Sequence, residues 1–129
     1  MESESVAGRD ADLGRAFAEA VARKDVAGVA GLLDPEIDFR GLTPNRSWEA
    51  TGADAVLELV LGQWFEDSDE IEQLVSIDTD AFADRHRVAF RFDVVNPEGK
   101  FVVEQQAYYT ARDGQIVWMR VLCSGFRPR

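Results

Sequence analysis

The first half of the chain places apolar residues at the spacing of α-helices. The pattern predicts a first helix that begins near Asp10, with a buried stripe of Leu13, Phe17, Ala20 and Val21. A second, shorter helix over residues 26–33 should stop at Asp34-Pro35, because proline cannot continue a helix. A third helix is predicted from Gly52 to Phe65, and it carries the most apolar stripe of the three: Val56, Leu57, Val60, Leu61 and Trp64.

The second half alternates apolar and polar residues, which is typical of half-buried strands. After a short strand over residues 37–40 and a loop over residues 42–51, the pattern predicts long strands over residues 71–80, 86–95, 100–111 and 115–125. Turn residues at 96–99 and 112–114 predict two hairpins, since glycine accepts the positive φ that such turns need.

Helices followed by a strand meander indicate an α+β fold, and we expect a cone in which a strongly bent, mostly antiparallel sheet wraps around the helices. A length of 129 residues fits one domain. We assign residues 10–129 to that domain and expect residues 1–9 to be a flexible tail. A pocket is expected between the sheet and the third helix, the most apolar of the three.

Charge and cysteine content narrow the possible partners. The formal net charge of -10 argues against nucleic acid and against anionic membrane surfaces, which attract basic proteins. Cys123 is the only cysteine, so the chain has no internal disulfide, which is compatible with a reducing compartment. The acidic start lacks the pattern of a signal peptide, no apolar run is long enough to span a membrane, and we expect a cytoplasmic protein.

Three segments carry a resemblance to a known superfamily: residues 17–39, residues 52–56 and residues 108–117. Together with the order of helices and strands, they resemble the NTF2-like superfamily, which includes SnoaL-like proteins, ketosteroid isomerases and limonene-epoxide hydrolases. The resemblance implies the cone fold, a pocket on the inner face of the sheet, and a homodimer formed through its outer face. It implies no single activity, because this fold carries enzymes, binders and assembly modules.

Arg91 and Asp93 are the strongest candidates for catalysis. Residues two apart on a strand share a face, so the arginine could orient the carboxylate and lower its pKa. In limonene-epoxide hydrolases, a similar pair works with a second aspartate, whose place matches Ser124 here, while the water-positioning Tyr and Asn fall near Phe39 and Gly41. A strand with a polar outer side explains the same alternation without any chemistry, and both interpretations stay open.

Other candidate acids and bases fit less well. Asp38 lies one residue from the place of the general base of the ketosteroid isomerases, and a one-residue slip reverses the face of a strand. Phe17 stands where those enzymes carry a tyrosine. His86 is the only histidine, which excludes a metal site with two histidines. We expect no metal and no cofactor.

The predicted function is therefore the binding of a small apolar ligand in the cone, without established catalysis. Phe39, Trp64, Tyr109 and Trp118 are the predicted ligand-binding residues. The alternative is an isomerase, cyclase or hydrolase that uses Arg91 and Asp93 for acid/base chemistry. The direction in which Asp93 points distinguishes the two hypotheses.

Overall fold

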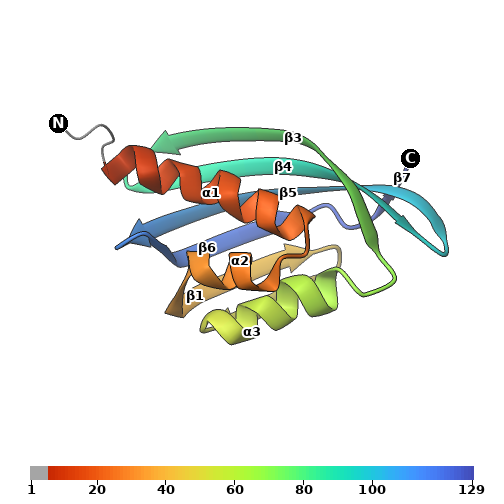
Figure 1. Cartoon of the computed structure of the whole chain (residues 1–129), viewed down its shortest axis with the longest axis horizontal. Coiled ribbons are helices and arrows are strands. Elements are labelled where there is room, and N and C mark those ends of the chain that lie inside the picture. The colour runs from red at the N-terminus through yellow and green to blue at the C-terminus, as the bar shows by residue number, and fades with distance from the viewer. Residues whose placement is uncertain (1–5) are drawn as a thin grey trace.

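The computed structural model describes residues 6–129. Within these residues, three helices lie against one face of a single large sheet (Figure 1). They are α1 (Val6–Ala22), α2 (Val26–Leu32) and α3 (Ala53–Glu58), and a π-helical turn, η1 (Leu59–Trp64), continues α3. The prediction of an α+β fold is confirmed, and the second and third helices begin where the sequence predicts.

The sheet is mixed, with the strand order β2-β1-β6-β5-β4-β3. Its members are β1 (Leu33–Thr43), β2 (Arg46–Thr51), β3 (Glu70–Phe82), β4 (Arg85–Asn96), β5 (Gly99–Arg112) and β6 (Gln115–Cys123). Neighbours are antiparallel except β1 and β6, which are parallel. A short strand, β7 (Arg127–Pro128), pairs with the start of β5.

Several boundaries differ from the sequence prediction: β1 begins at Leu33 instead of residue 37, and β6 ends at Cys123 instead of residue 125. Helix α1 begins at Val6, so residues 6–9 of the expected tail are helical, and residues 1–5 lie outside the described part. The loop predicted over residues 42–51 is wrong, because β1 extends to Thr43 and β2 pairs with it. A tight turn at Pro44-Asn45 makes this hairpin possible, since Asn45 adopts the positive φ of 66° that asparagine tolerates.

The two hairpins predicted after residue 95 are confirmed. Asn96 pairs with Gly99, and Arg112 pairs with Gln115, so each turn contains two residues. In the second turn, Asp113 and Gly114 both have positive φ, 54° and 78°. This conformation matches the right-handed twist of the strands on either side.

The face of the sheet beneath the helices, here called the inner face, carries the core. Alternate residues of the central strands point to it and are almost fully buried, among them Phe39, Phe90, Phe92, Val103, Tyr109 and Met119. Phe17 of α1 packs on Phe90 with their ring centroids 6.4 Å apart. Burial of each such phenylalanine contributes roughly 1.5–3 kcal/mol, so this contact helps to hold α1 on the sheet.

The intervening residues of the same strands lie on the opposite, outer face.

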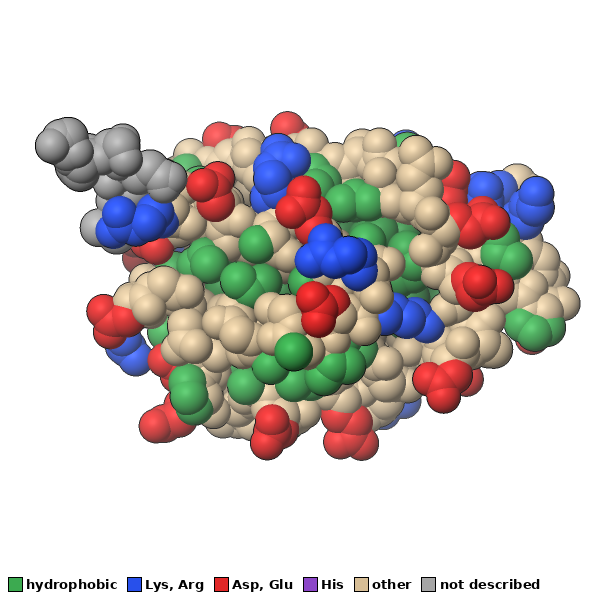
Figure 2. Space-filling model, viewed as in Figure 1, with side chains coloured by type: hydrophobic (Ala, Val, Ile, Leu, Met, Phe, Trp, Pro, Cys, Tyr) green, Lys and Arg blue, Asp and Glu red, His purple; other side chains and the backbone are tan. Residues whose placement is uncertain are grey.

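Figure 2 looks onto the helix side of the molecule, where acidic side chains are distributed around the margin, in agreement with the net charge of -10. In the part of the chain that is described, no helix combines the length and the apolar character needed to cross a membrane.

Candidate functional site

A pocket of about 200 Å³ lies where the β1–β2 hairpin, η1 and the residues after β6 meet. It is found on the inner face, at the end of the molecule that Figure 1 marks with the C-terminus. Thr43, Trp48, Trp64 and Phe65 line it from the side of the hairpin and of η1, and Val103, Gln105, Cys123 and Phe126 line it from the other strands. An apolar cavity of roughly 150 Å³ accommodates benzene, so this pocket has room for a single ring.

Trp64 is the centre of the aromatic wall. Its ring contacts Phe39 at a centroid distance of 5.8 Å and Trp48 at 6.3 Å. It also covers Gly41, where a Cβ atom would lie 2.6 Å from the Cη2 atom of Trp64. The close approach of the indole to the β1 backbone therefore requires glycine, and it fixes the orientation of Trp64.

Trp64, a residue of the pocket wall, carries a buried donor that has no acceptor among the described residues. The Nε1 atom of Trp64 is buried and makes no hydrogen bond, whereas Nε1 of Trp48 donates to Oγ1 of Thr43 at 2.8 Å. A buried donor without a partner costs about 1–3 kcal/mol. An acceptor atom on a ligand would remove that cost.

Gln105 is a polar residue of the pocket lining, as are Thr43 and Gln63. Its side chain is 1% exposed, and its Nε2 atom donates to the Sγ atom of Cys123 at 3.5 Å. The residues that line the pocket include no Asp, Glu, His, Lys or Arg. This environment fits a neutral ligand and offers no charged group for a proton transfer.

Arg91 and Asp93 lie outside this pocket, on the outer face of β4. Their neighbours Phe90 and Phe92 point to the core instead. Nη2 of Arg91 donates to Oε1 of Glu104 at 2.6 Å, and Oδ2 of Asp93 lies 3.4 Å from Nη1 of Arg129. Each charge therefore has its own partner on the outer face, and their joint role in catalysis stays a prediction.

The structure separates the four predicted ligand-binding residues. Trp64 alone among them lines the pocket, and Phe39 packs behind it in the core. Trp118 lies on the outer face, where the guanidinium groups of Arg85 and Arg120 stand 4.3 and 4.5 Å from the centroid of its ring. These contacts are cation–π interactions, which need no ligand.

Tyr109 is on the inner face but anchors α1. Its hydroxyl group donates to the carbonyl oxygen of Asp10 at 2.7 Å and accepts from the backbone nitrogen of Gly14 at 2.9 Å. Burial raises the pKa of Tyr109 to about 12. His86 stacks on the Tyr109 ring with centroids 5.2 Å apart, and its Nδ1 atom is buried without a partner among the described residues.

Asp38, the counterpart considered for the base of ketosteroid isomerases, also lies on the outer face. Its Oδ1 atom is 3.2 Å from Nη1 of Arg120, and its side chain is 58% exposed. The one-residue shift seen in the sequence therefore turns this carboxylate away from the core. Over residues 6–129, no group of three or more His, Cys, Asp or Glu side chains forms a potential metal site.

Most residues of the pocket lining were not among the predicted ligand-binding residues, and Gln105 and Phe126 are two examples. The alternation on β5 groups Gln105 with Ala107 and Tyr109, and all three prove to be buried. A polar residue in the buried register was thus the available signal for Gln105. Phe126 follows the last long strand, and only the chain reversal at Gly125, with a φ of 75°, brings it to the pocket.

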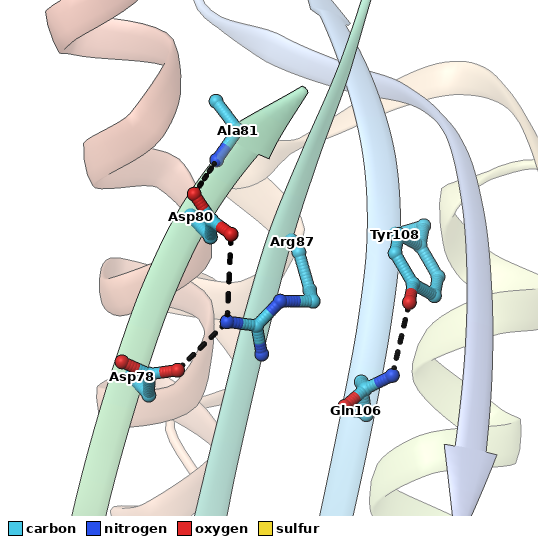
Figure 3. A network of polar contacts seen from close by, with 6 residues as sticks. All are labelled: Asp78, Asp80, Ala81, Arg87, Gln106 and Tyr108. Atoms are coloured by element: carbon cyan, nitrogen blue, oxygen red, sulfur yellow. Dashed lines mark hydrogen bonds and ion pairs between the residues drawn. The ribbon is translucent and has the colours of Figure 1, made fainter. Parts of the chain in front are cut away.

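The outer face carries polar contacts on β3, β4 and β5: ion pairs between β3 and β4, and a neutral hydrogen bond on β5 (Figure 3). Nη2 of Arg87 donates to Oδ2 of Asp78 at 2.7 Å and lies 4.0 Å from Oδ2 of Asp80. The hydrogen bond to Asp78 is the main cause that raises the pKa of Arg87 above its usual value. On β5, Nε2 of Gln106 donates to the Tyr108 hydroxyl at 3.1 Å.

A larger hollow of about 540 Å³ lies on the outer face over β1, β2, β5 and β6. Leu42 and Leu122 are cross-strand neighbours in this hollow and are 51% and 57% exposed. Exposed leucines that lie side by side form an apolar patch, and such patches mark interaction surfaces.

With the fold and pocket defined, the sequence identifies the family. Residues 14–119 match the SnoaL-like domain family, so the match covers most of the chain. The chain therefore belongs to the SnoaL-like domain family, within the NTF2-like superfamily. The sequence matches no functionally curated protein.

Solved structures share the fold at low sequence identity. A candidate isomerase from Bacillus subtilis has a TM-score of 0.77 at 16% identity, over 93% of this chain and 89% of that chain. A candidate polyketide cyclase from Xanthomonas campestris has a TM-score of 0.70 at 22% identity, over 88% and 89%. An LEH-like epoxide hydrolase from M. tuberculosis has a TM-score of 0.66 at 13% identity, over 89% and 82%. At such identities the likeness shows the fold alone.

Proposed function

We propose that this SnoaL-like protein binds a small neutral ligand, apolar except for one hydrogen-bond acceptor, in the pocket beside Trp64. The unpartnered Nε1 donor of Trp64 carries this proposal. Ligand sites combine apolar walls with a few polar groups that fix orientation. In the cone expected for this family, such a pocket would form the open end.

The surroundings of the pocket favour binding over acid/base catalysis. A general base must reach the proton that it removes, and the pocket lining contains no carboxylate or imidazole. Arg91 and Asp93, the pair predicted for catalysis, contact Glu104 and Arg129 on the outer face instead. This pocket therefore gives no support for the activities named for the similar cyclase, isomerase and hydrolase structures.

A matched pair of ligands tests the proposal. Cyclohexanone and methylenecyclohexane have nearly the same shape, but only the ketone oxygen is a good hydrogen-bond acceptor. We expect the wild-type protein to bind cyclohexanone about five- to tenfold more tightly, as one hydrogen bond of about 1 kcal/mol implies. Binding can be measured by ligand-observed NMR over a concentration series.

Two variants complete this test. Trp64→Phe keeps an aromatic wall but removes the donor, so it should bind both ligands alike. Trp118→Phe changes an indole on the outer face and should keep the wild-type preference for the ketone. Equal binding of both ligands by the wild-type protein, or no binding of either, would contradict the proposal.

We propose further that the outer face forms a homodimer around Leu42 and Leu122. Arg120 lies two residues from Leu122 on one side of the apolar pair. Glu104 lies on the other side, two residues from Gln106, the cross-strand partner of Leu122. A two-fold axis through the leucines would thus bring the arginine of one copy near the glutamate of the other, which makes the face self-complementary.

Sedimentation velocity tests this interface. Leu122→Glu places a charge in the centre of the proposed contact and should convert dimers to monomers. Val26→Glu alters an apolar residue of equal exposure, 57%, on α2 and should leave the dimer intact. A wild-type protein that remains monomeric at 100-fold higher concentration than the binding assays use would reject the dimer.

We also propose a cytoplasmic location. Its support is the lone thiol of Cys123, which is buried, unpaired and compatible with a reducing compartment. Imaging of the tagged full chain in its own organism would test this, and a secreted product would contradict it.

A further inference from the structure

The residues after β6 form part of the pocket wall, and residues 124–129 are here called the C-terminal strap. Its first residue is fixed to β5. The backbone nitrogen of Ser124 donates to the carbonyl oxygen of Glu104 at 2.9 Å, and Oγ of Ser124 accepts from the Glu104 nitrogen at 2.9 Å. The strap therefore begins at a firmly held point.

The chain changes direction immediately after that point. Gly125 adopts a φ of 75°, and a Cβ atom there would lie 2.8 Å from Cγ of Pro44 in the β1–β2 turn. Phe126 follows, with its ring 6.0 Å from the centroid of Phe65 and 5.7 Å from that of Phe101. Gly125 and Phe126 both line the pocket, so this part of the strap forms one of its walls.

The far end of the strap is held by Arg129. Its Nη2 atom donates to Oε1 of Glu72 at 2.9 Å, and its Nη1 atom lies 3.4 Å from Oδ2 of Asp93. Its Nε atom donates to the carbonyl oxygen of Phe101 at 2.9 Å. One side chain thus connects the strap to β3, β4 and β5.

The contacts of Arg129 stabilise the fold less than the packing of the buried core residues does. The side chains of Arg129, Asp93 and Glu72 are 27%, 26% and 49% exposed, so water and salt screen their attraction. β7 consists of only two residues. Segments with few buried contacts open locally at a small fraction of the cost of unfolding.

We propose that the C-terminal strap is the gate of the pocket, with Gly125 as its hinge, Phe126 as its plug and Arg129 as its latch. Opening releases Arg129 from Asp93, from Glu72 and from the backbone of β4 and β5, and it moves Phe126 away from Phe65, which widens the pocket. This regulation rests on the proposed function, because it controls access to the same site. It also gives Asp93 a positioning role on the outer face.

A first experiment needs no ligand and therefore does not depend on the proposed function. The indole N–H of Trp64 is buried, and Trp64 lines the same pocket as Gly125 and Phe126, so the exchange of this N–H with D₂O, followed by NMR, should report opening. Arg129→Ala should accelerate this exchange about five- to thirtyfold, the ratio that a change of one to two kcal/mol produces. Arg127→Ala, which truncates an exposed arginine of the same strap, should leave the rate within twofold.

Conservative variants separate the latch from general destabilisation. Arg129→Lys keeps the positive charge but cannot contact Glu72, Asp93 and the Phe101 carbonyl oxygen together, so its exchange rate should be intermediate. Asp93→Asn should also give an intermediate exchange rate. Raising the salt concentration should accelerate exchange in the wild-type protein but not in Arg129→Ala. If Arg129→Ala and Arg127→Ala exchange equally fast, or if the urea midpoint falls in proportion to the exchange rate, the gate is rejected.

A second experiment links the gate to binding. If cyclohexanone binds, Arg129→Ala should raise its association and dissociation rates together by about fivefold or more, with a smaller change in Kd. NMR line shapes measure both rates. If cyclohexanone does not bind but Trp64 exchange is faster in Arg129→Ala than in the wild-type protein, the proposed ligand is rejected and the gate is retained. If cyclohexanone binds but its association and dissociation rates are the same in both proteins, the gate alone is rejected.

Discussion

The hydroxyl group of Tyr109 accepts a hydrogen bond from the backbone nitrogen of Gly14 at 2.9 Å, across 95 residues of sequence. The contact requires glycine, because a Cβ atom at position 14 would lie 2.9 Å from that hydroxyl and from Cβ of Val88. The one proton of the same hydroxyl is shared between the carbonyl oxygens of Asp10 at 2.7 Å and Ala11 at 3.1 Å. β5 thereby holds the N-terminal half of α1 against the sheet.

Removal of this hydroxyl should destabilise the protein without affecting the pocket. Tyr109→Phe leaves the Gly14 nitrogen without its partner and should lower the free energy of unfolding by about 1–3 kcal/mol. Urea unfolding followed by circular dichroism measures the change. Tyr108→Phe is the matched control, because the Tyr108 hydroxyl contacts Gln106 on the outer face and its loss should cost less than about 0.5 kcal/mol.

The raised pKa of Tyr109 predicts a loss of stability at alkaline pH. In the unfolded chain a tyrosine ionises near its reference pKa of about 10, while burial in the folded state raises the pKa of Tyr109 to about 12. Between these values the folded state binds more protons, so stability falls as pH rises. The contribution is complete below pH 10 and is lost as pH rises to about 12.

The measurement is a series of urea unfolding curves from about pH 8.5 to 11.5, which spans the onset of this ionisation. Wild type and Tyr108→Phe should lose stability over that range, and Tyr109→Phe should lose less of it. A Tyr109→Phe variant with the same pH slope as the wild type would show that another group causes the alkaline loss.

Much of this fold follows from local sequence patterns. Helical spacing marks α1 through Phe17 and Val21, and positive-φ turns at Gly99 and Gly114 fix two hairpins. β2 was not predicted, because it is an edge strand with an exposed, polar sequence. Its pairing with β1 depends on the turn at Pro44-Asn45. Such pairing is decided by the neighbouring strand, which local propensity does not show.

The close packing of Trp64 on Gly41 gives another test. Gly41→Ala would place a methyl group 2.6 Å from Cη2 of Trp64, so the indole must move. We expect a loss of about 1–3 kcal/mol of stability from overpacking, and a changed chemical shift of the Trp64 indole N–H. Gly31→Ala in α2 has open space around the new methyl group and should stabilise the protein by about 0.5–1 kcal/mol. A neutral Gly41→Ala would contradict the packing described here.

The variant Arg91→Ala tests the alternative hypothesis that Arg91 and Asp93 perform acid/base chemistry. Its contact with Glu104 joins side chains that are 52% and 53% exposed, so Arg91→Ala should cost less than about 1 kcal/mol. Cyclohexanone affinity should change by less than twofold, because Arg91 does not line the pocket. Calorimetric titration measures this affinity. A large loss of affinity in Arg91→Ala would show that Arg91 takes part in the binding site.

The candidate site was less predictable than the fold. Alternation shows that Arg91 and Asp93 share one face but not which face, and the burial of Phe90 and Phe92 settles that only in three dimensions. Trp64 does line a pocket, because the apolar helix that ends at this residue lies over the sheet, and its role in ligand binding stays a prediction. The role of Phe126 depends on a chain reversal and on contacts with Phe65 and Phe101, which are distant in sequence.

The most direct test of the account is the NMR signal of the Trp64 indole N–H during titration with cyclohexanone. Trp64→Phe assigns the signal, since the other two tryptophans remain. The account predicts a downfield shift that saturates with the ketone and is absent with methylenecyclohexane, as expected when a free donor gains an acceptor. If the ketone shifts the signal no more than the hydrocarbon does, Trp64 is not the polar contact of this pocket, and the proposed function is wrong.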